Sequence, residues 1–333
     1  MLAVLAGVAV VGGGIYGSTY SASSVGALLR GPITGLLTAL PMASYELFYV
    51  LSPRGEALRR LSVGTAMAIK TVVYLVIILF GLEAGRQIAA IGADLPPRAD
   101  YEVLRNTLFS LGFAIVVTAV LQVRRMLGPG VLMNFILGRY HKPREELRIF
   151  LFVDLVGSTE LAERIAGTRF LEMLNSIYRH ITEPIAEHGG EIHKYVGDEV
   201  IVTWRPKTGF ADANCLRCVF AIEAQMRGLA DFYERKFGHV PKFRGGLHLG
   251  PVVVGEVGDI KQEIAFLGDG MNTTARLVDL CREKQRAFVA SAAVLERLTL
   301  PAGIVAEPLG DITLRGKSEP LPVFALTRRP ATA

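Results

Sequence analysis

Four long apolar stretches with almost no charged residues fill the first 130 positions, and they restrict the folds open to this chain more than any other feature. The stretches cover residues 1–29, 31–51, 61–82 and 106–123. Each is close to the ~20 residues that a helix needs to cross the hydrocarbon core of a bilayer. Lys70 interrupts the third stretch, so it must reach the interface or face the interior of a helix bundle. We expect an all-α transmembrane bundle of about four helices over residues 1–127.

Basic residues beside these stretches predict how the bundle is oriented. They are Arg54, Arg59, Arg60, Arg124 and Arg125. Because short cytoplasmic loops carry the excess of Lys and Arg, both termini are expected on the cytoplasmic side. If residues 1–29 were a cleaved signal peptide instead, three spans would remain and the C-terminal half would still lie inside. The prediction is a multi-pass protein of the cell (inner) membrane with a cytoplasmic C-terminal domain.

The composition agrees with a membrane protein and argues against one that binds nucleic acid. Hydrophobic residues make up 51% of the chain, and the mean hydropathy is +0.38. The net charge is only +5, and basic residues gather after the last span, at Arg139, Lys142 and Arg144. A basic edge next to a membrane is typical of contact with anionic lipid, whereas a nucleic-acid surface needs clustered basic residues and aromatic platforms. We expect the lipid bilayer as a partner and no nucleic acid.

The three cysteines do not match the spacing of a zinc site. Cys215 and Cys218 form a single C-x-x-C within a helical apolar pattern, and Cys281 stands alone. A structural zinc site would need a second pair of ligands. Core packing in a reducing cytoplasm is the favoured interpretation.

The rest of the chain predicts a linker and one further domain. Residues 128–147 are rich in Gly, Pro and charge and form the linker, and the domain covers residues 148–328. Its predicted elements are a strand at 148–155, a helix at 158–187 interrupted by Gly167, a hairpin at 191–204, a helix at 212–237, strands at 243–257 and 263–268, a helix at 271–284 and a strand at 323–326. This β-α-β-β-α-β order predicts an α+β, ferredoxin-like sandwich.

Two aspartates are placed to meet at one edge of the predicted sheet. Asp154 closes the apolar strand that begins at Arg148, and Asp198 lies at the tip of the hairpin. If the two strands are neighbours, both carboxylates emerge at the same edge. Paired carboxylates suit hard divalent cations, which could bind a nucleoside triphosphate. Either aspartate alone would be typical of an ordinary turn.

A second polar cluster follows the strand that ends at Leu267. Glycines at 268 and 270 end this strand, and a helical pattern follows. Asn272 and Arg276 are four residues apart, so they share one face of that helix. A guanidinium with five donors and an amide that donates and accepts could together hold a ribose and a phosphate in transit.

Taken together, these residues resemble the catalytic domain of the class III nucleotidyl (adenylate/guanylate) cyclases. The resemblance runs from about Arg148 to Leu326 and covers nearly all of the predicted soluble domain. It rests on four motifs in the family's order, Phe152–Thr159, Lys194–Asp198, Leu267–Arg276 and Leu314–Lys317. Each motif alone is a weak pattern, whereas four in order are a strong one.

The resemblance implies a metal and phosphate site. Asp154 and Asp198, with the backbone carbonyl of Leu155, would bind two Mg²⁺ or Mn²⁺ ions per site. The residues implied in phosphate binding are Gly157, Ser158 and Thr159, through backbone N–H groups, and Arg315. A helix N-terminus after Gly157 fits this role independently, because such ends favour anions.

The resemblance also implies how the nucleoside is held. Asn272 and Arg276 would orient the ribose and stabilise the pentavalent phosphate. Lys194 falls at the purine-selecting position of adenylate cyclases, where guanylate cyclases usually have an acid. Ala265 falls at the second purine-selecting position, which is commonly Asp, Thr or Ser. Because alanine has no side-chain hydrogen-bonding group, Lys194 favours ATP but Ala265 weakens the discrimination.

The implied reaction converts ATP into 3′,5′-cyclic AMP and pyrophosphate, as the 3′-hydroxyl attacks the α-phosphorus in line. No residue resembles a dedicated base, and His188, His193 and His248 fit structural roles better. Catalysis is therefore ascribed to metal ions, positioning and charge stabilisation. In this family the site lies between two catalytic domains, and this chain carries both halves of the site on one domain. A homodimer with two equivalent sites is expected.

Three alternatives remain open at this point. A guanylate cyclase is favoured by Ala265 and disfavoured by Lys194. A diguanylate cyclase is suggested by the segment 196–200, which resembles the GGDEF signature but has a single glycine. The third is a catalytically weak, nucleotide-binding receptor that responds to an unidentified membrane or ligand signal.

Overall fold

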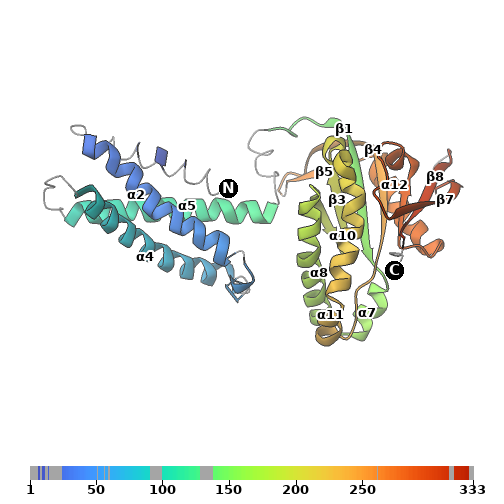
Figure 1. The fold of residues 1–333 in the computed structure, drawn as a ribbon, viewed down its shortest axis with the longest axis horizontal. Helices are drawn as coiled ribbons and strands as arrows, with labels where there is room; N and C mark the ends of the chain where they lie inside the picture. Colours follow the sequence, from blue (N-terminus) through green and yellow to red (C-terminus); the bar gives the residue numbers. More distant parts are fainter. Residues whose placement is uncertain are drawn as a thin grey trace. The chain divides into compact units, whose positions relative to one another are not determined.

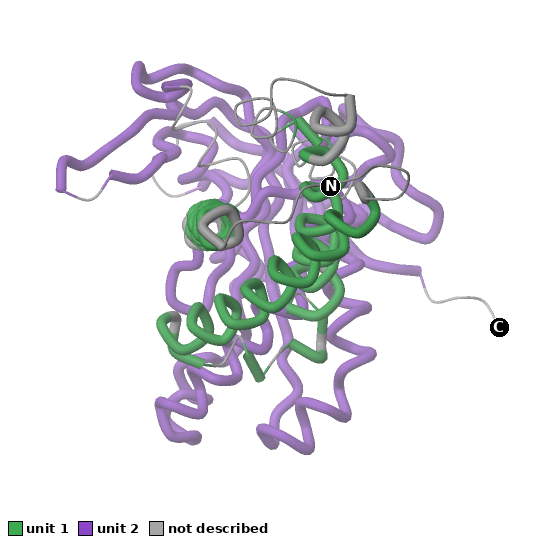
Figure 2. The backbone as a smooth tube through the Cα atoms, turned by 90° about the vertical axis from the view of Figure 1, so that its left-hand side faces the viewer, with its two compact units in different colours: residues 1–123 green, residues 124–333 purple. Residues whose placement is uncertain are grey.

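In the computed structural model, two compact units divide the chain, residues 1–123 and residues 124–333 (Figure 2). The structure describes residues 7, 10, 11, 14, 25–50, 52–55, 57–58, 61–90, 100–127, 138–260, 262–314 and 319–329. Each unit is considered separately below.

The described residues of the N-terminal unit are helical apart from Ser52, Leu61 and Ser62 (Figure 1). Its elements are α2 (Val25–Ser44), the π-helix η1 (Tyr45–Val50), the 3₁₀-helix η2 (Pro53–Gly55), α4 (Val63–Ala90) and α5 (Asp100–Leu127). Two stretches, Gly31–Val50 and Gly64–Ile88, are long and apolar enough to cross a membrane, and Leu104–Val120 is a shorter apolar helix. The structure therefore supports two of the four expected spans. Most of residues 1–29, the first expected span, lies outside the described residues.

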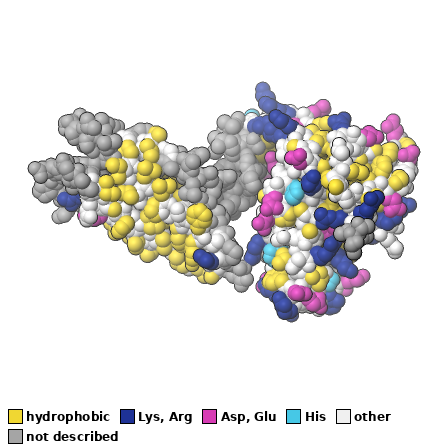
Figure 3. Space-filling view, viewed as in Figure 1, with side chains coloured by type: hydrophobic (Ala, Val, Ile, Leu, Met, Phe, Trp, Pro, Cys, Tyr) yellow, Lys and Arg dark blue, Asp and Glu magenta, His cyan; other side chains and the backbone are white. Residues whose placement is uncertain are grey.

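Many exposed side chains of this unit are apolar, and a buried ion pair lies inside it. Val72, Val76 and Phe80 are strongly exposed on α4, and hydrophobic side chains cover the drawn face of this unit (Figure 3). Lys70 is buried, and its ammonium group lies 2.6 Å from a carboxylate oxygen of Glu46. Of the two alternatives predicted for Lys70, the structure supports the one in which it faces the interior of the helical unit.

The second unit is built on one mixed sheet. Its strands are β1 (Arg144–Leu155), β2 (Glu191–Val196), β3 (Glu199–Trp204), β4 (Phe243–Val257), β5 (Glu263–Leu267), β6 (Phe288–Ser291), β7 (Ile304–Ile312) and β8 (Leu321–Arg328). They are ordered β2-β3-β1-β4-β6-β8-β7, and β5 pairs with β4 outside this path. The first four strands of this order form the expected ferredoxin-like core. β6, β7 and the two ends of β8 extend the sheet beyond what the sequence pattern predicted.

Helices cover both faces of this sheet (Figure 1). They are α7 (Ser158–Arg164), α8 (Gly167–Glu187), α9 (Pro206–Phe210), the 3₁₀-helix η3 (Ala211–Ala213), α10 (Asn214–Gly228), α11 (Ala230–Phe237), α12 (Asp269–Glu283) and α13 (Ala292–Leu295). The predicted break at Gly167 is confirmed. The single helix predicted over 212–237 is wrong, because the chain breaks after Gly228 and continues as α11.

The position of β1 in the sheet explains why its sequence is apolar without alternation. Ile149, Leu151 and Val153 point into the core under α8 and α10, whereas Phe150 and Phe152 point into a second core under β5 and α12. A strand covered on both faces has no polar side to display. β1 begins at Arg144, four residues before the predicted start.

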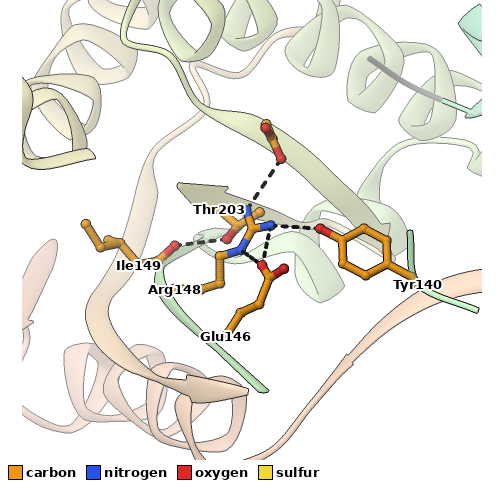
Figure 4. A network of polar contacts seen from close by, with 6 residues as sticks. Tyr140, Glu146, Arg148, Ile149 and Thr203 are labelled. Carbon is orange, nitrogen blue, oxygen red and sulfur yellow. Dashed lines mark hydrogen bonds and ion pairs between the residues drawn. The ribbon is translucent and has the colours of Figure 1, made fainter. Parts of the chain in front are cut away.

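A buried arginine fixes the start of β1. Arg148 is only 2% exposed, and its guanidinium donates to Glu146 at 2.8 Å and to the Tyr140 hydroxyl at 3.3 Å (Figure 4). Glu191 at the start of β2 lies 3.6 Å away, and the guanidinium also stacks over the Phe266 ring. This network ties β1, β2, β5 and the segment before β1 together.

Candidate functional site

Asp154 and Asp198 meet at one edge of the sheet. β1 pairs antiparallel with β3, with Val153 opposite Val200, so the end of β1 lies beside the turn that joins β2 to β3. Burial raises the pKa of Asp154, and its interaction with Asp198 raises it further. The adjacency of the two carboxylates, predicted from the strand pattern, is confirmed.

Arg244 was not predicted as a site residue, yet it contacts this pair directly. It lies opposite Asp154 in the β1–β4 register. Its Nε and Nη2 atoms lie 2.7 and 2.5 Å from the same carboxylate oxygen of Asp154, and this opposes the rise in the pKa of Asp154. Only the pairing register reveals Arg244, because 90 residues separate it from Asp154.

Glu199 adds a third acidic group next to Asp198. Burial raises its pKa to about 7, and the charges of Asp154, Asp198 and Asp279 contribute to the rise. Asp279 lies on α12, so this helix also brings negative charge toward the cluster. A group of carboxylates with one arginine is an environment in which additional positive charge is favourable.

This environment fits a divalent cation. The carboxylate oxygens of Asp154 and Asp198 are the ligand type that Mg²⁺ and Mn²⁺ prefer, and a guanidinium already occupies a cationic position beside Asp154. The Leu155 side chain is fully buried, so only its backbone carbonyl could take part.

The loop after β1 turns sharply into α7. Gly157 has φ of 71° and is the N-cap of this helix, in a left-handed conformation that favours glycine. No side chain caps the helix, so the backbone N–H groups around Ser158 and Thr159 meet no capping oxygen. These groups could donate to an anion.

Tyr178 holds the turn that carries Asp198. Its hydroxyl donates to the carbonyl of Gly197 at 2.5 Å, and its ring packs on Tyr195 with centroids 4.3 Å apart. The helix α8 is thereby attached to the tip of the β2–β3 hairpin. The apolar pattern of α8 gave no sign of this contact.

α12 presents the Asn/Arg pair on its outer face. Asn272 is exposed and Arg276 is half-buried, and the other side of the helix packs closely on β4. A Cβ atom added at Gly250 would lie 2.6 Å from the Cα of Gly270. Among the described residues, no hydrogen bond or ion pair joins the side chain of Asn272 or Arg276 to another side chain or to the Asp154 cluster.

The two positions that the resemblance implies in purine selection lie on β2 and β5. Lys194 is exposed, and its ammonium group lies 3.1 and 3.3 Å from the two carboxylate oxygens of Glu263. Ala265 follows two residues later on β5. Glu263 was missed by the sequence reasoning. Arg315 lies outside the described residues.

The other polar residues considered from the sequence make structural contacts. His248 bonds to Ser291 at 2.8 Å, His188 contacts the carbonyl of Pro184 at 2.8 Å, and His193 packs edge-on against Phe266. The cysteines are free and buried, as expected for core residues; they are Cys215, Cys218 and Cys281.

Comparison with known proteins places these features in context. Residues 140–327 match the family described as adenylate and guanylate cyclase catalytic domain. The chain is 34% identical to adenylate cyclase 2 of Rhizobium meliloti (strain 1021) over 95% of its own length and 84% of that protein. It is 28% identical to adenylate cyclase 1 of the same organism, over 52% of this chain and 26% of that protein. The structure of a bacterial light-regulated adenylyl cyclase is similar in fold, with a TM-score of 0.57 at 20% identity over 67% of this chain and 65% of that one.

Proposed function

This chain belongs to the family of adenylate and guanylate cyclase catalytic domains, and we propose that it is a membrane-anchored adenylate cyclase. It converts ATP into 3′,5′-cyclic AMP and pyrophosphate. The observation that carries this proposal is the adjacency of Asp154 and Asp198, with the largely buried Arg244 paired to Asp154.

Asp154 and Asp198, with the Leu155 carbonyl, are the proposed ligands of two Mg²⁺ or Mn²⁺ ions. When bound, the ions would lower the barrier by stabilising the charge on the attacking and leaving oxygens. The N–H groups of Gly157, Ser158 and Thr159 bind the triphosphate. A cation held by Asp154 would compete with Arg244 for this carboxylate, and the guanidinium of Arg244 could then donate to a phosphate oxygen.

Asn272 orients the ribose, and Arg276 stabilises the negative charge that develops on the α-phosphate. No hydrogen bond or ion pair among the described residues joins this pair to the Asp154 cluster, and this supports a homodimer in which each protomer contributes one half of every site. Apolar side chains near the metal and purine positions are exposed and suit burial by a second copy. They are Val156, Tyr195, Val196 and Leu267.

Lys194 favours ATP over GTP, because an ammonium group can donate to the ring nitrogen N1 of adenine. The two long apolar helices of the N-terminal unit support anchoring in the cell membrane. The arginines around the spans favour a cytoplasmic catalytic domain, where ATP is available. Residues 128–147 would then carry any membrane or ligand signal to the catalytic domain.

Product analysis tests the proposal. The full-length protein in detergent is incubated separately with ATP and GTP plus Mn²⁺, and the products are identified by mass. We expect cyclic AMP from ATP and far less product from GTP. A preference for GTP would identify a guanylate cyclase, a cyclic dinucleotide would identify a diguanylate cyclase, and no product from either would identify a receptor.

Asp154→Asn tests the carboxylate role directly. This substitution should abolish turnover while leaving the fold intact, because a neutral amide binds hard cations poorly. Trp204 is the single tryptophan and is fully buried in the catalytic unit, so its fluorescence reports the fold. Asp231→Asn, at an exposed position on α11, is the matched control and should retain activity. Activity in the Asp154 variant would refute the metal role.

A further inference from the structure

Ala265 leaves the purine site without a second polar group. A lone Lys194 is a donor only; it favours adenine through N1, but O6 of guanine also offers it an acceptor, so the preference is weak. Strong discrimination between bases requires a site that leaves a buried polar group unpaired when the wrong base binds. A hydrogen-bond acceptor next to Lys194 would meet this requirement, because it would be left unpaired when the wrong base binds.

Glu263 lies on the same face of β5 as Ala265. Successive side chains of a strand alternate between faces, so residues two apart share a face. Ile264 and Phe266 point into the core beneath this strand, which directs Glu263 and Ala265 to the opposite face. The Cα atoms of Glu263 and Ala265 are thus only ~7 Å apart along the strand. The longer side chain of Glu263 can span this distance.

A bulge in β2 brings Lys194 to this carboxylate. The register of β2 against β3 shifts between Ile192 and Lys194, so His193 is an extra residue in the strand. His193 packs against Phe266 of β5, with ring centroids 4.5 Å apart. Lys194, the next residue, contacts both oxygens of Glu263 at 3.1 and 3.3 Å.

The pair is accessible to a ligand. The side chains of Lys194 and Glu263 are 48% and 43% exposed, and an exposed ion pair of this kind contributes little to stability. A base could therefore insert its polar edge between the two groups at small cost. The edge of adenine offers an acceptor at N1 next to a donor at the 6-amino group, which matches an ammonium and a carboxylate.

We propose that Glu263 is the second purine-selecting residue of this chain and accepts a hydrogen bond from the 6-amino group of adenine. This inference rests on the proposed adenylate cyclase function and deepens it. Lys194 donates to N1, and Glu263 fills the role that Ala265 cannot fill.

The test compares two substrates in wild type and in Glu263→Ala. One substrate is ATP, and the other is purine riboside triphosphate, which lacks the 6-amino group. For ATP, kcat/KM should fall about tenfold in the variant, the effect expected from loss of one hydrogen bond to a charged group. For purine riboside triphosphate, kcat/KM should be the same in wild type and variant.

Two further variants keep the result interpretable. Glu263→Gln retains an acceptor and should recover much of the activity with ATP. Glu307→Ala is the matched control, because Glu307 is a similarly exposed carboxylate that pairs with Arg286 at 3.0 Å and lies on β7. This variant should leave kcat/KM unchanged for both substrates. Trp204 fluorescence confirms that each variant is folded.

The outcomes separate this inference from the proposed function. An equal loss with both substrates would mean that Glu263 only holds Lys194 in place, and no loss with either would mean that it lies outside the site; both results overturn the inference. If wild type itself makes no cyclic AMP from ATP, the proposed function fails, whatever the variants do.

Discussion

Arg244 and Asp154 face each other across neighbouring strands and form the closest ion pair in the described part of the catalytic unit. Two guanidinium nitrogens lie within 2.7 Å of one carboxylate oxygen, and both side chains are largely buried. The arginine neutralises a carboxylate that burial and the nearby Asp198 would otherwise make costly to ionise. A divalent cation bound at Asp154, as proposed above, would therefore compete with Arg244 for this carboxylate.

Arg244→Gln should destabilise the metal-free protein and increase the stabilisation that added metal provides. Removing one partner of a largely buried ion pair leaves the other charge uncompensated and costs about 3 kcal/mol. A cation that binds the folded state restores this loss by mass action. We expect a lower Tm without metal and a larger rise on adding Mn²⁺ than in wild type, measured by Trp204 fluorescence.

Arg286→Gln is the control for this prediction. It breaks the exposed pair with Glu307, so it should change neither the metal-free Tm nor the Mn²⁺-induced rise by much. If Arg244→Gln instead left the metal-free Tm unchanged and reduced the Mn²⁺-induced rise, Arg244 would help to hold the metal and would not compete with it for Asp154.

Tyr178→Phe should raise the metal concentration that the enzyme requires. The change removes the hydrogen bond to the Gly197 carbonyl but keeps the ring that packs on Tyr195. Loss of one hydrogen bond in the turn would allow Asp198 to move away from Asp154. The Mn²⁺ concentration for half-maximal activity should rise about threefold to tenfold, with kcat at saturating metal nearly unchanged.

Tyr233→Phe removes a comparable hydrogen bond, to Nδ1 of His180 at 2.7 Å, away from the hairpin. Its metal dependence should match wild type. The same metal dependence in both variants would show that the Tyr178 contact does not position Asp198.

The sequence was sufficient for the features that depend on local pattern. The strand ends at Asp154 and Asp198, the break at Gly167 and the helix that carries Asn272 all follow from apolar periodicity and glycines. The positions of Arg244 and Glu263 depend on which strands pair and in which register, and single-sequence patterns do not fix either. β6 was missed because its four residues are too few to show a periodic pattern. β7 was missed because Pro308 and Gly310, which usually mark turns, lie within it.

The contribution of His193 to the stability of the catalytic unit should fall as the pH is lowered from about 6.5 to about 4. Burial lowers the pKa of His193 to about 4, with the charge of Lys194 adding to the effect. The unfolded chain then takes up a proton that the folded state does not bind, so stability is lost as pH falls through this window. The slope from this group is at most about 1.4 kcal/mol per pH unit.

His193→Phe should remove this part of the pH dependence, because phenylalanine keeps an aromatic contact with Phe266 and does not titrate. The measurement is urea unfolding followed by Trp204 fluorescence between pH 4 and 7. Ile192→Val removes packing in the same strand. It should lower the free energy of unfolding by a similar amount at every pH and leave its slope against pH unchanged. An unchanged slope in the His193 variant would contradict the assignment.

Arg148→Ala should be among the most destabilising single changes in the catalytic unit. The guanidinium is 2% exposed and pairs with Glu146 at 2.8 Å, so its removal leaves an uncompensated carboxylate and a cavity beside Phe266. We expect a loss of about 3 to 5 kcal/mol in the free energy of unfolding, measured by Trp204 fluorescence in urea. Arg148→Met with Glu146→Gln should recover most of this loss, because the methionine fills the cavity and the glutamine is neutral. A single variant as stable as wild type, or a double variant no better than the single, would show that the Arg148 network does not stabilise the start of β1.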